Sequence, residues 1–183
     1  EVLQNTFKPY ACCLLTHATI DAGRALAAQL AGREIARVVC HINSLGVQLA
    51  GKPAPTTALE GKFSTAYCAA LALSGFAATQ TDFSPERIAD PALRALTARV
   101  TLAGDAAIAE TAATMVVEFA DGTRAEHAVA MARGNPSNPL SWDDLRAKFM
   151  PLAAPVLGAG AAGELFACLQ HFEQPGSAAR MWT

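Results

Sequence analysis

A group of polar side chains near the N-terminus contains the residue types that proton-transfer chemistry uses. Its members are Lys8, Tyr10, Cys12, Cys13, Thr16 and His17. Lysine supplies a positive charge or, when burial lowers its pKa, a base, and histidine exchanges protons near neutral pH. Because the free N–H groups at the start of a helix favour anions, Lys8 and His17 could together bind a carboxylate substrate. A solvated lysine and a helical histidine without a chemical role would fit the same residues.

Other residues with reactive side chains form no recognised motif. His41, His127 and His171 do not lie at helical spacing from one another or from His17, which argues against a histidine-based metal site. The five cysteines include no Cys-x-x-Cys pair, so we interpret them as reduced, mostly buried thiols of a cytoplasmic protein. The sequence also has no glycine-rich phosphate loop and no Gly-x-Ser-x-Gly elbow. It therefore predicts neither a metal site nor nucleotide or serine-hydrolase chemistry.

The composition narrows the class of protein. The chain has 183 residues, of which 52% are hydrophobic and only 16% charged, so it can bury a core and is not disordered. A formal net charge of -2 gives no basic field for nucleic acid. The most apolar stretch, 66–78, is shorter than the roughly 20 residues that span a membrane, so no membrane partner is expected. The low charge suggests that part of the surface faces a second domain or subunit.

Hydrophobic periodicity and capping residues predict the elements that position these side chains. Thr16 is a candidate cap for a first helix that ends near Gly32, and Ser64, Ser84 and Asp90 are candidate caps for later helices. Glycines and prolines predict a loop over 45–57. The expected helices cover 17–31, 64–73, 85–90 and 91–97, and the strand between the first two covers 35–42.

The second half of the chain changes to the alternation typical of strands. Strands are predicted at 99–103 and in a hairpin over 112–131, in which Asp121-Gly122 is the strongest turn signal. Ser141 and Asp144 approximate a capping box for a C-terminal helix, which Gly158 and Gly160 are expected to break before a last helix over 163–172. The predicted fold is α+β, an antiparallel sheet with helices on one face, followed by C-terminal helices.

Three segments of the chain resemble the MmgE/PrpD family, in the same order. Residues 7–22 read FKPYACCLLTHATIDA, residues 61–64 and 67–73 read GKFS and YCAALAL, and residues 134–149 read GNPSNPLSWDDLRAKF. The family includes 2-methylcitrate dehydratase, cis-aconitate decarboxylase and iminodisuccinate epimerase. The resemblance covers the family's α/β domain and the helices that return after it.

The resemblance implies a domain organisation. Residues 1–134 would form an α/β lid-type domain, and residues 135–183 a helical segment that packs on an N-terminal helical domain this chain does not contain. The last two helices should therefore carry an exposed apolar face, unless a dimer covers it. A cytoplasmic homodimer is the expected assembly.

The resemblance also implies a reaction class. It predicts the C-terminal portion of a lyase or isomerase that removes a proton next to a carboxylate of a di- or tricarboxylate without metal or organic cofactor. A 2-methylcitrate dehydratase of propionate metabolism is the model case. The implied catalytic residues are Lys8 and His17, and the implied substrate-binding residues are Lys8, Cys13, Thr65 and Tyr67. The alternative is a non-catalytic folded fragment that serves as an interdomain or dimerisation module, and the chain alone is expected to be inactive.

Overall fold

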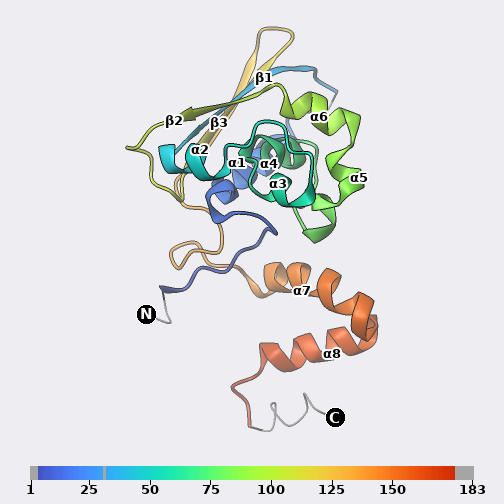
Figure 1. The fold of residues 1–183 in the computed structure, drawn as a ribbon. Helices are drawn as coiled ribbons and strands as arrows, with labels where there is room; N and C mark the ends of the chain where they lie inside the picture. The colour runs from blue at the N-terminus through green and yellow to red at the C-terminus, as the bar shows by residue number, and fades with distance from the viewer. Residues whose placement is uncertain (1–3, 31, 176–183) are drawn as a thin grey trace. The chain divides into compact units, whose positions relative to one another are not determined.

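A computed structural model describes residues 4–30 and 32–175. The chain forms two compact units, Glu1–Asn138 and Pro139–Thr183. The first unit contains the sheet and most of the helices, and the second contains two helices (Figure 1). None of the helices in the described part of the chain is both long and apolar enough to span a membrane.

The sheet of the first unit has four strands in the order β2-β1-β3-β4. These are β1 (Ile35–Ile42), β2 (Val100–Gly104), β3 (Ala113–Phe119) and β4 (Arg124–Val129). β3 is antiparallel to both β1 and β4, whereas β2 runs parallel to β1. The prediction of a wholly antiparallel sheet was therefore wrong, although the α+β class and all four strands are confirmed.

The parallel pairing has its origin in the connection between β1 and β2. Parallel neighbours cannot be joined by a tight turn and need a crossover, here residues 43–99. The first part of it was predicted to be loop but contains α2 (Ser44–Ala50), because the Asn43 side chain accepts a hydrogen bond from the Leu45 N–H and caps the helix. Gly46 lies inside α2 and allows a close approach to β1, because an added Cβ would lie 3.3 Å from Ile42 Cδ1.

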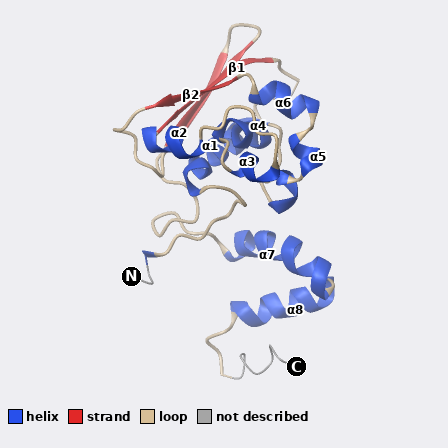
Figure 2. Ribbon diagram, viewed as in Figure 1, coloured by secondary structure: helices blue, strands red, loops and turns tan. Residues whose placement is uncertain are grey.

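Helices of the first unit lie on one side of the sheet (Figure 2). The Ser64, Ser84 and Asp90 caps are confirmed by hydrogen bonds from backbone N–H groups to their side chains. The first helix ends at residue 27, whereas its predicted end, residue 31, lies outside the described residues. The expected cap of this helix, Thr16, makes no capping hydrogen bond. The helices are α1 (His17–Ala27), α3 (Ala58–Lys62), α4 (Thr65–Leu73), α5 (Pro85–Ile88) and α6 (Pro91–Thr97), with short 3-10 helices η2 (Leu14–Thr16) and η3 (Gln80–Phe83).

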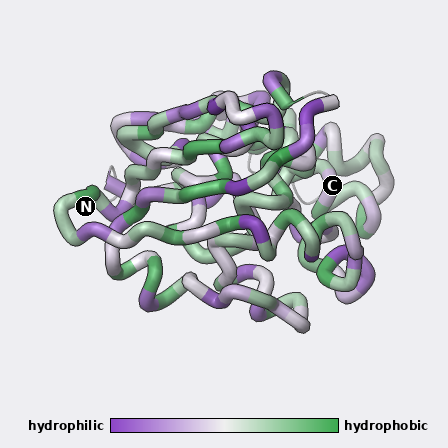
Figure 3. The backbone as a smooth tube through the Cα atoms, turned by 90° about the horizontal axis from the view of Figure 1, so that it is seen from above, coloured by the Kyte–Doolittle hydropathy of each residue, from purple (hydrophilic) through white to green (hydrophobic). Residues whose placement is uncertain are grey.

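The core lies between the sheet and the pair α1 and α4. Alternate side chains of β1 and β3, among them Val38, Cys40 and Met115, are fully buried against the helices. Buried and partly buried residues accordingly alternate along β3. Figure 3 shows the hydropathy of the residues along the chain. α1 and α4 approach closely at Gly23, where an added Cβ would lie 2.7 Å from that of Ala72. The absence of a side chain at Gly23 therefore lets the middle of α1 pack closely on α4.

The predicted hairpin between β3 and β4 is confirmed. Gly122 has φ +80°, a conformation that glycine adopts without steric cost, and Asp121 accepts a hydrogen bond of 2.9 Å from the Thr123 N–H. The turn is also joined to the start of β1 by the ion pair between Arg33 and Asp121 at 3.1 Å. This hairpin brings residues 131–138 back toward the N-terminal segment.

The second unit consists of α7 (Trp142–Leu157) and α8 (Ala159–Gln170). The predicted capping box of Ser141 and Asp144 is present. Gly158, with φ +82°, separates the helices, but Gly160 lies inside α8, which therefore begins earlier than predicted. Trp142 and Phe149 both pack on Phe166. Four large hydrophobic side chains of α7 are exposed, Trp142, Leu152, Val156 and Leu157, and so is Phe172, which follows α8.

Candidate functional site

The N-terminal segment 6–13 is bound by three different parts of the first unit. Phe7 N–H donates to the Gly134 carbonyl at 2.9 Å, Ala11 N–H to the Ala78 carbonyl at 3.0 Å, and Cys13 N–H to the Lys62 carbonyl at 2.9 Å. Two of these acceptors belong to the second and third sequence segments of the resemblance. The first segment, far from the other two in sequence, is therefore hydrogen-bonded to both of them.

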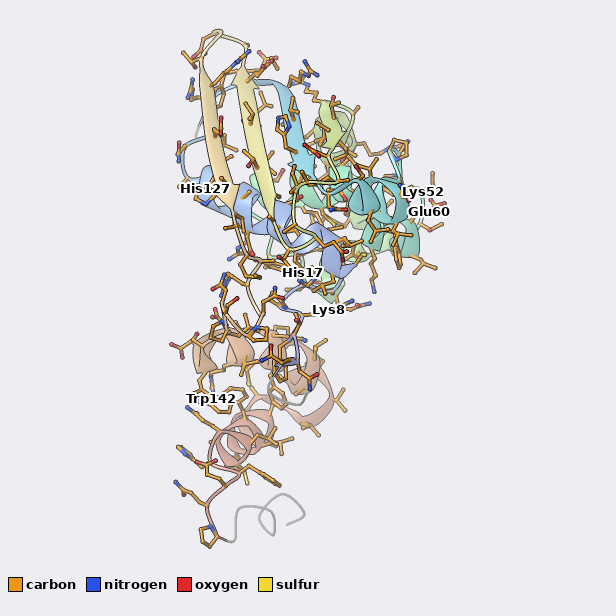
Figure 4. All side chains as sticks on the ribbon, turned by 90° about the vertical axis from the view of Figure 1, so that its left-hand side faces the viewer. Lys8, His17, Lys52, Glu60, His127 and Trp142 are labelled. Atoms are coloured by element: carbon orange, nitrogen blue, oxygen red, sulfur yellow. The ribbon has the colours of Figure 1, made fainter. Side chains whose placement is uncertain are left out.

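Lys8 and Cys13 lie on the accessible side of this junction. The Lys8 side chain is exposed, and its Nζ donates to the carbonyl oxygen of Cys12 at 3.2 Å. Cys13 is half-buried and fixed through its backbone. Figure 4 shows Lys8 and His17 at the same end of the first unit, whereas His127 lies on β4. A cation held beside a fixed backbone can bind a carboxylate group.

His17, the first residue of α1, has no exposed surface. Its ring packs edge-on against the Tyr10 ring, with centroids 5.2 Å apart. Neither Nδ1 nor Nε2 has a hydrogen-bond partner among the described residues. Buried polar groups are nearly always hydrogen-bonded, because leaving one unsatisfied costs free energy. The ring therefore occupies an unusual environment for a purely structural residue.

Cys12 is the polar neighbour of that imidazole. Its Sγ lies 3.0 Å from Thr16 Oγ1, and the side chain is 6% exposed. A hydrogen bond from Cys68, followed by the influence of His17 and Thr16, lowers the pKa of the Cys12 thiol to about 5 despite burial. The pKa of Cys68 moves in the opposite direction, first because of its hydrogen bond to Cys12. The two thiols therefore shift each other's pKa in opposite directions.

A second polar network fixes the backbone on which Lys8 and Cys12 lie. The Tyr10 hydroxyl donates to Asp21 Oδ1 at 2.5 Å, and Asp21 Oδ2 accepts from the Arg133 N–H at 2.8 Å. Burial, with the negative charge of Asp21, raises the pKa of Tyr10 so that it stays protonated as a donor. Asp21 on α1 therefore joins the N-terminal segment to the chain that leaves β4.

The other two predicted substrate-binding residues lie deeper. Thr65 and Tyr67, in the first turn of α4, are fully buried. The Thr65 hydroxyl donates to the Ala50 carbonyl and the Tyr67 hydroxyl to the Asp82 carbonyl, both at 2.8 Å. Their hydroxyl protons are used within the protein, and the structure does not bring them to the accessible side where Lys8 lies.

Sequence reasoning missed that Cys12 and Cys68 lie in the same buried cluster. Both cysteines were interpreted as small buried side chains, and both are indeed buried. No local spacing could indicate that they share a cluster, because they lie on separate segments. Over the described ranges, no group of three or more His, Cys, Asp or Glu side chains could hold a metal ion.

Comparison with known proteins gives the family. The model of the MmgE/PrpD C-terminal domain matches residues 10–171, beginning just after Lys8 and including Cys12, Cys13, His17 and Cys68. A search of curated proteins found no matching relative. Since the family model covers most of the chain, this protein belongs to the MmgE/PrpD family, with residues 10–171 forming its C-terminal domain.

Proposed function

We propose that this domain contributes the segment Lys8–Cys13 to the active site of a cofactor-independent lyase or isomerase that acts on a di- or tricarboxylate. A reaction like that of 2-methylcitrate dehydratase is the specific form of the proposal. The observation that carries it is an exposed lysine on the first family motif, whose backbone is hydrogen-bonded to residues of the other two motifs. The N-terminal helical domain of the family would supply the rest of the site.

Lys8 has the chemistry that this reaction class requires. Removing a proton next to a carboxylate places a second negative charge on that group, and an adjacent ammonium stabilises the charge as it develops. The Lys8 Nζ is already held at 3.2 Å from the Cys12 carbonyl, so little side-chain entropy is lost on binding. Elimination of water, loss of CO2 or reprotonation can each follow from the same intermediate.

His17 has a less direct role in this proposal. Because its ring has no exposed surface, it cannot contact a substrate unless the segment 8–13 moves. It lies against Tyr10 and beside Cys12, and both residues belong to the same segment as Lys8. We assign His17 the positioning of this segment, with Cys13 as the second side chain on the accessible face.

The test compares Lys8→Ala with Lys52→Ala in the full chain assembled with an N-terminal helical domain of the family. Lys52 is a suitable control because it is about half exposed and pairs with Glu60 on the surface. Turnover is measured with 2-methylcitrate, cis-aconitate and an aspartate-derived dicarboxylate. We expect Lys8→Ala to lower kcat about 10²–10³-fold and Lys52→Ala to leave it unchanged.

Two results would oppose the proposal in different ways. Full activity in Lys8→Ala, with correct folding, would remove the role given to Lys8 but keep the reaction class. Absence of turnover for every di- and tricarboxylate in the wild-type assembly would reject the lyase or isomerase itself. Isothermal titration with citrate on the chain alone separates binding from catalysis.

A further inference from the structure

Lys62, the last residue of α3, is bonded to the same peptide group as Lys8. The Lys8 Nζ donates to the carbonyl oxygen of Cys12 at 3.2 Å, and the N–H of Cys13 donates to the carbonyl oxygen of Lys62 at 2.9 Å. This carbonyl and this N–H belong to one trans peptide group and point in opposite directions. Lys8 and Lys62 therefore lie at the two edges of the same fixed peptide.

The Lys62 ammonium is held in place without an acidic partner. Its Nζ donates to Gln80 Oε1 at 2.9 Å and lies 5.9 Å from the centre of the Phe83 ring. In the part of the chain that the structure describes, no Asp or Glu side chain forms an ion pair with Lys62. An ammonium has three N–H donors, of which the neutral Gln80 takes one. The positive charge and two donors are therefore left for an anion.

The acidic side chains of the two elements that hold Lys62 are engaged elsewhere. Glu60, on α3, forms an ion pair with Lys52 at 2.7 Å. Asp82, on η3, accepts hydrogen bonds from the N–H of Thr79 at 2.8 Å and from its hydroxyl at 3.0 Å. Neither carboxylate compensates the charge of Lys62, which makes this lysine unlike its neighbour Lys52.

Both ends of Lys62 are tied to the segment that carries Lys8. Its backbone holds this segment through Cys13, and its Nζ is bonded to Gln80 at the start of η3. The chain just before η3 is itself bonded to the segment, because the Ala78 carbonyl accepts from the Ala11 N–H at 3.0 Å. One short stretch of backbone thus positions both cations.

We propose that Lys62 binds a second carboxylate of the substrate, while Lys8 binds the carboxylate next to the proton that is removed. This inference rests on the proposed function and adds that the ligand must carry at least two carboxylates on a short carbon backbone. The flexible four-carbon stems of the two lysines can adjust to the distance between those groups. Lys62 is then a specificity-determining residue, which favours di- and tricarboxylates over monocarboxylates.

Two arginines near the same junction are less suitable for this role. Arg133 bonds through its N–H to Asp21 Oδ2 at 2.8 Å, and Arg24 lies three residues after Asp21 on α1. A substrate carboxylate at either arginine would meet the negative charge of Asp21, which opposes the binding of a second anion. Lys62 has no such carboxylate beside it.

The first test compares Lys62→Met with Lys52→Met in the full chain assembled with an N-terminal helical domain of the family. Lys52 is a matched control, because its N–H bonds to the Phe63 carbonyl next to Lys62 while its charge is paired with Glu60. We expect Lys62→Met to raise KM for 2-methylcitrate and cis-aconitate about 10–10²-fold with little change in kcat, whereas Lys8→Ala acts mainly on kcat. Lys62→Arg, which keeps the charge, should restore most of the loss.

Chemical labelling of the wild-type assembly needs no variant. Acetic anhydride acetylates accessible lysine amines, and a carboxylate bound to the ammonium slows this reaction. With citrate as the probe, peptide mass spectrometry should show slower acetylation of Lys8 and Lys62 and unchanged acetylation of Lys52. Propionate, which has one carboxylate, should protect Lys62 no more than it protects Lys52.

The outcomes separate this inference from the proposed function. An unchanged KM in Lys62→Met, or protection of Lys8 alone by citrate, would overturn the role of Lys62 and leave the reaction class standing. Absence of turnover in the wild-type assembly would reject the reaction class, and labelling would still decide the binding site. In that case, protection of both lysines by citrate upholds the site, and protection of neither rejects it as well.

Discussion

Tyr10 and Asp21 share a hydrogen bond of 2.5 Å that ties the N-terminal segment to α1. The other Asp21 oxygen accepts from the Arg133 N–H, so one carboxylate orders two segments that flank the proposed site. Tyr10 is almost completely buried, which makes the carboxylate dependent on this donor. Two of the predictions below follow from how that junction is held together.

Tyr10→Phe removes the donor but keeps the ring that packs on His17. We expect the free energy of unfolding in urea to fall by about 1.5–3 kcal/mol, because the lost hydrogen bond is to a charged group. A double-mutant cycle with Asp21→Ala should return a coupling energy of at least about 1 kcal/mol. Additive losses in the two single variants would show that the short contact contributes nothing of its own.

Gly134→Ala should lower the stability of the fold by more than the positive φ at this position alone would explain. Gly134 has φ +91°, and an added Cβ would lie 1.9 Å from the carbonyl oxygen of Phe7, so the N-terminal segment must move away. Gly122→Ala is the control, because Gly122 has φ +80° but open space around it.

The control variant should lose about 1–2 kcal/mol of stability from the positive φ alone, and Gly134→Ala should lose clearly more. Amide hydrogen exchange at Phe7 should also accelerate in Gly134→Ala only. Equal losses in the two variants, with Phe7 still protected, would refute the close approach.

Tyr67→Phe should act on stability and not on ligand binding. Its hydroxyl is buried and donates to the Asp82 carbonyl, so the variant leaves a buried acceptor unsatisfied at a cost of about 1–3 kcal/mol. Affinity for a di- or tricarboxylate, measured by calorimetry at a temperature where both forms are folded, should not change. A large loss of affinity would instead show that the Tyr67 hydroxyl binds the ligand.

The contribution of Glu60 to the stability of the fold should be lost in acid. Hydrogen bonds from Lys52 and Thr56 lower the pKa of Glu60 from 4.5 to about 2. Its folded pKa lies below its unfolded one, so its contribution is complete above about pH 4.5 and is lost as the pH falls toward 2.

The stability difference between wild type and Glu60→Gln should therefore be largest above pH 5 and shrink toward pH 2, as measured by urea unfolding over a pH series. Added salt should reduce it as well, because the pair is exposed. Glu110→Gln controls for the loss of one surface charge. A difference that is constant with pH would contradict the assignment.

The sequence predicted the elements whose signals are local. The strand at 35–42 coincides with β1, and the Asp121-Gly122 turn and the caps of α4, α5 and α6 are where the residue types placed them. Each depends on neighbouring residues only. The direction of β2 depends instead on how the crossover returns to the sheet. Gly46 and Gly51 suggested a loop and so concealed α2, the first helix of that crossover.

The features of the site likewise divide into those that neighbouring residues predict and those that depend on distant contacts. Lys8 and His17 could be singled out because their types and the start of α1 suggested chemistry within one segment. The burial of His17 and its unpartnered nitrogens could not be predicted, because they result from packing against Tyr10 and other segments. The buried cluster that Cys12 and Cys68 share joins α4 to the N-terminal segment and likewise appears only in the folded chain.

The hydrogen bond from Phe7 to Gly134 also sets an order of events during synthesis. Thr6 and its partner Asn135, next to that bond, are 129 positions apart. At roughly 5–20 residues per second, the ribosome makes Gly134 about 6–25 s after Phe7. During the last part of that interval the segment that carries Lys8 can bond to Lys62 and Ala78 but not to Gly134, so the bond beside Lys8 is among the last features of the nascent unit to be established.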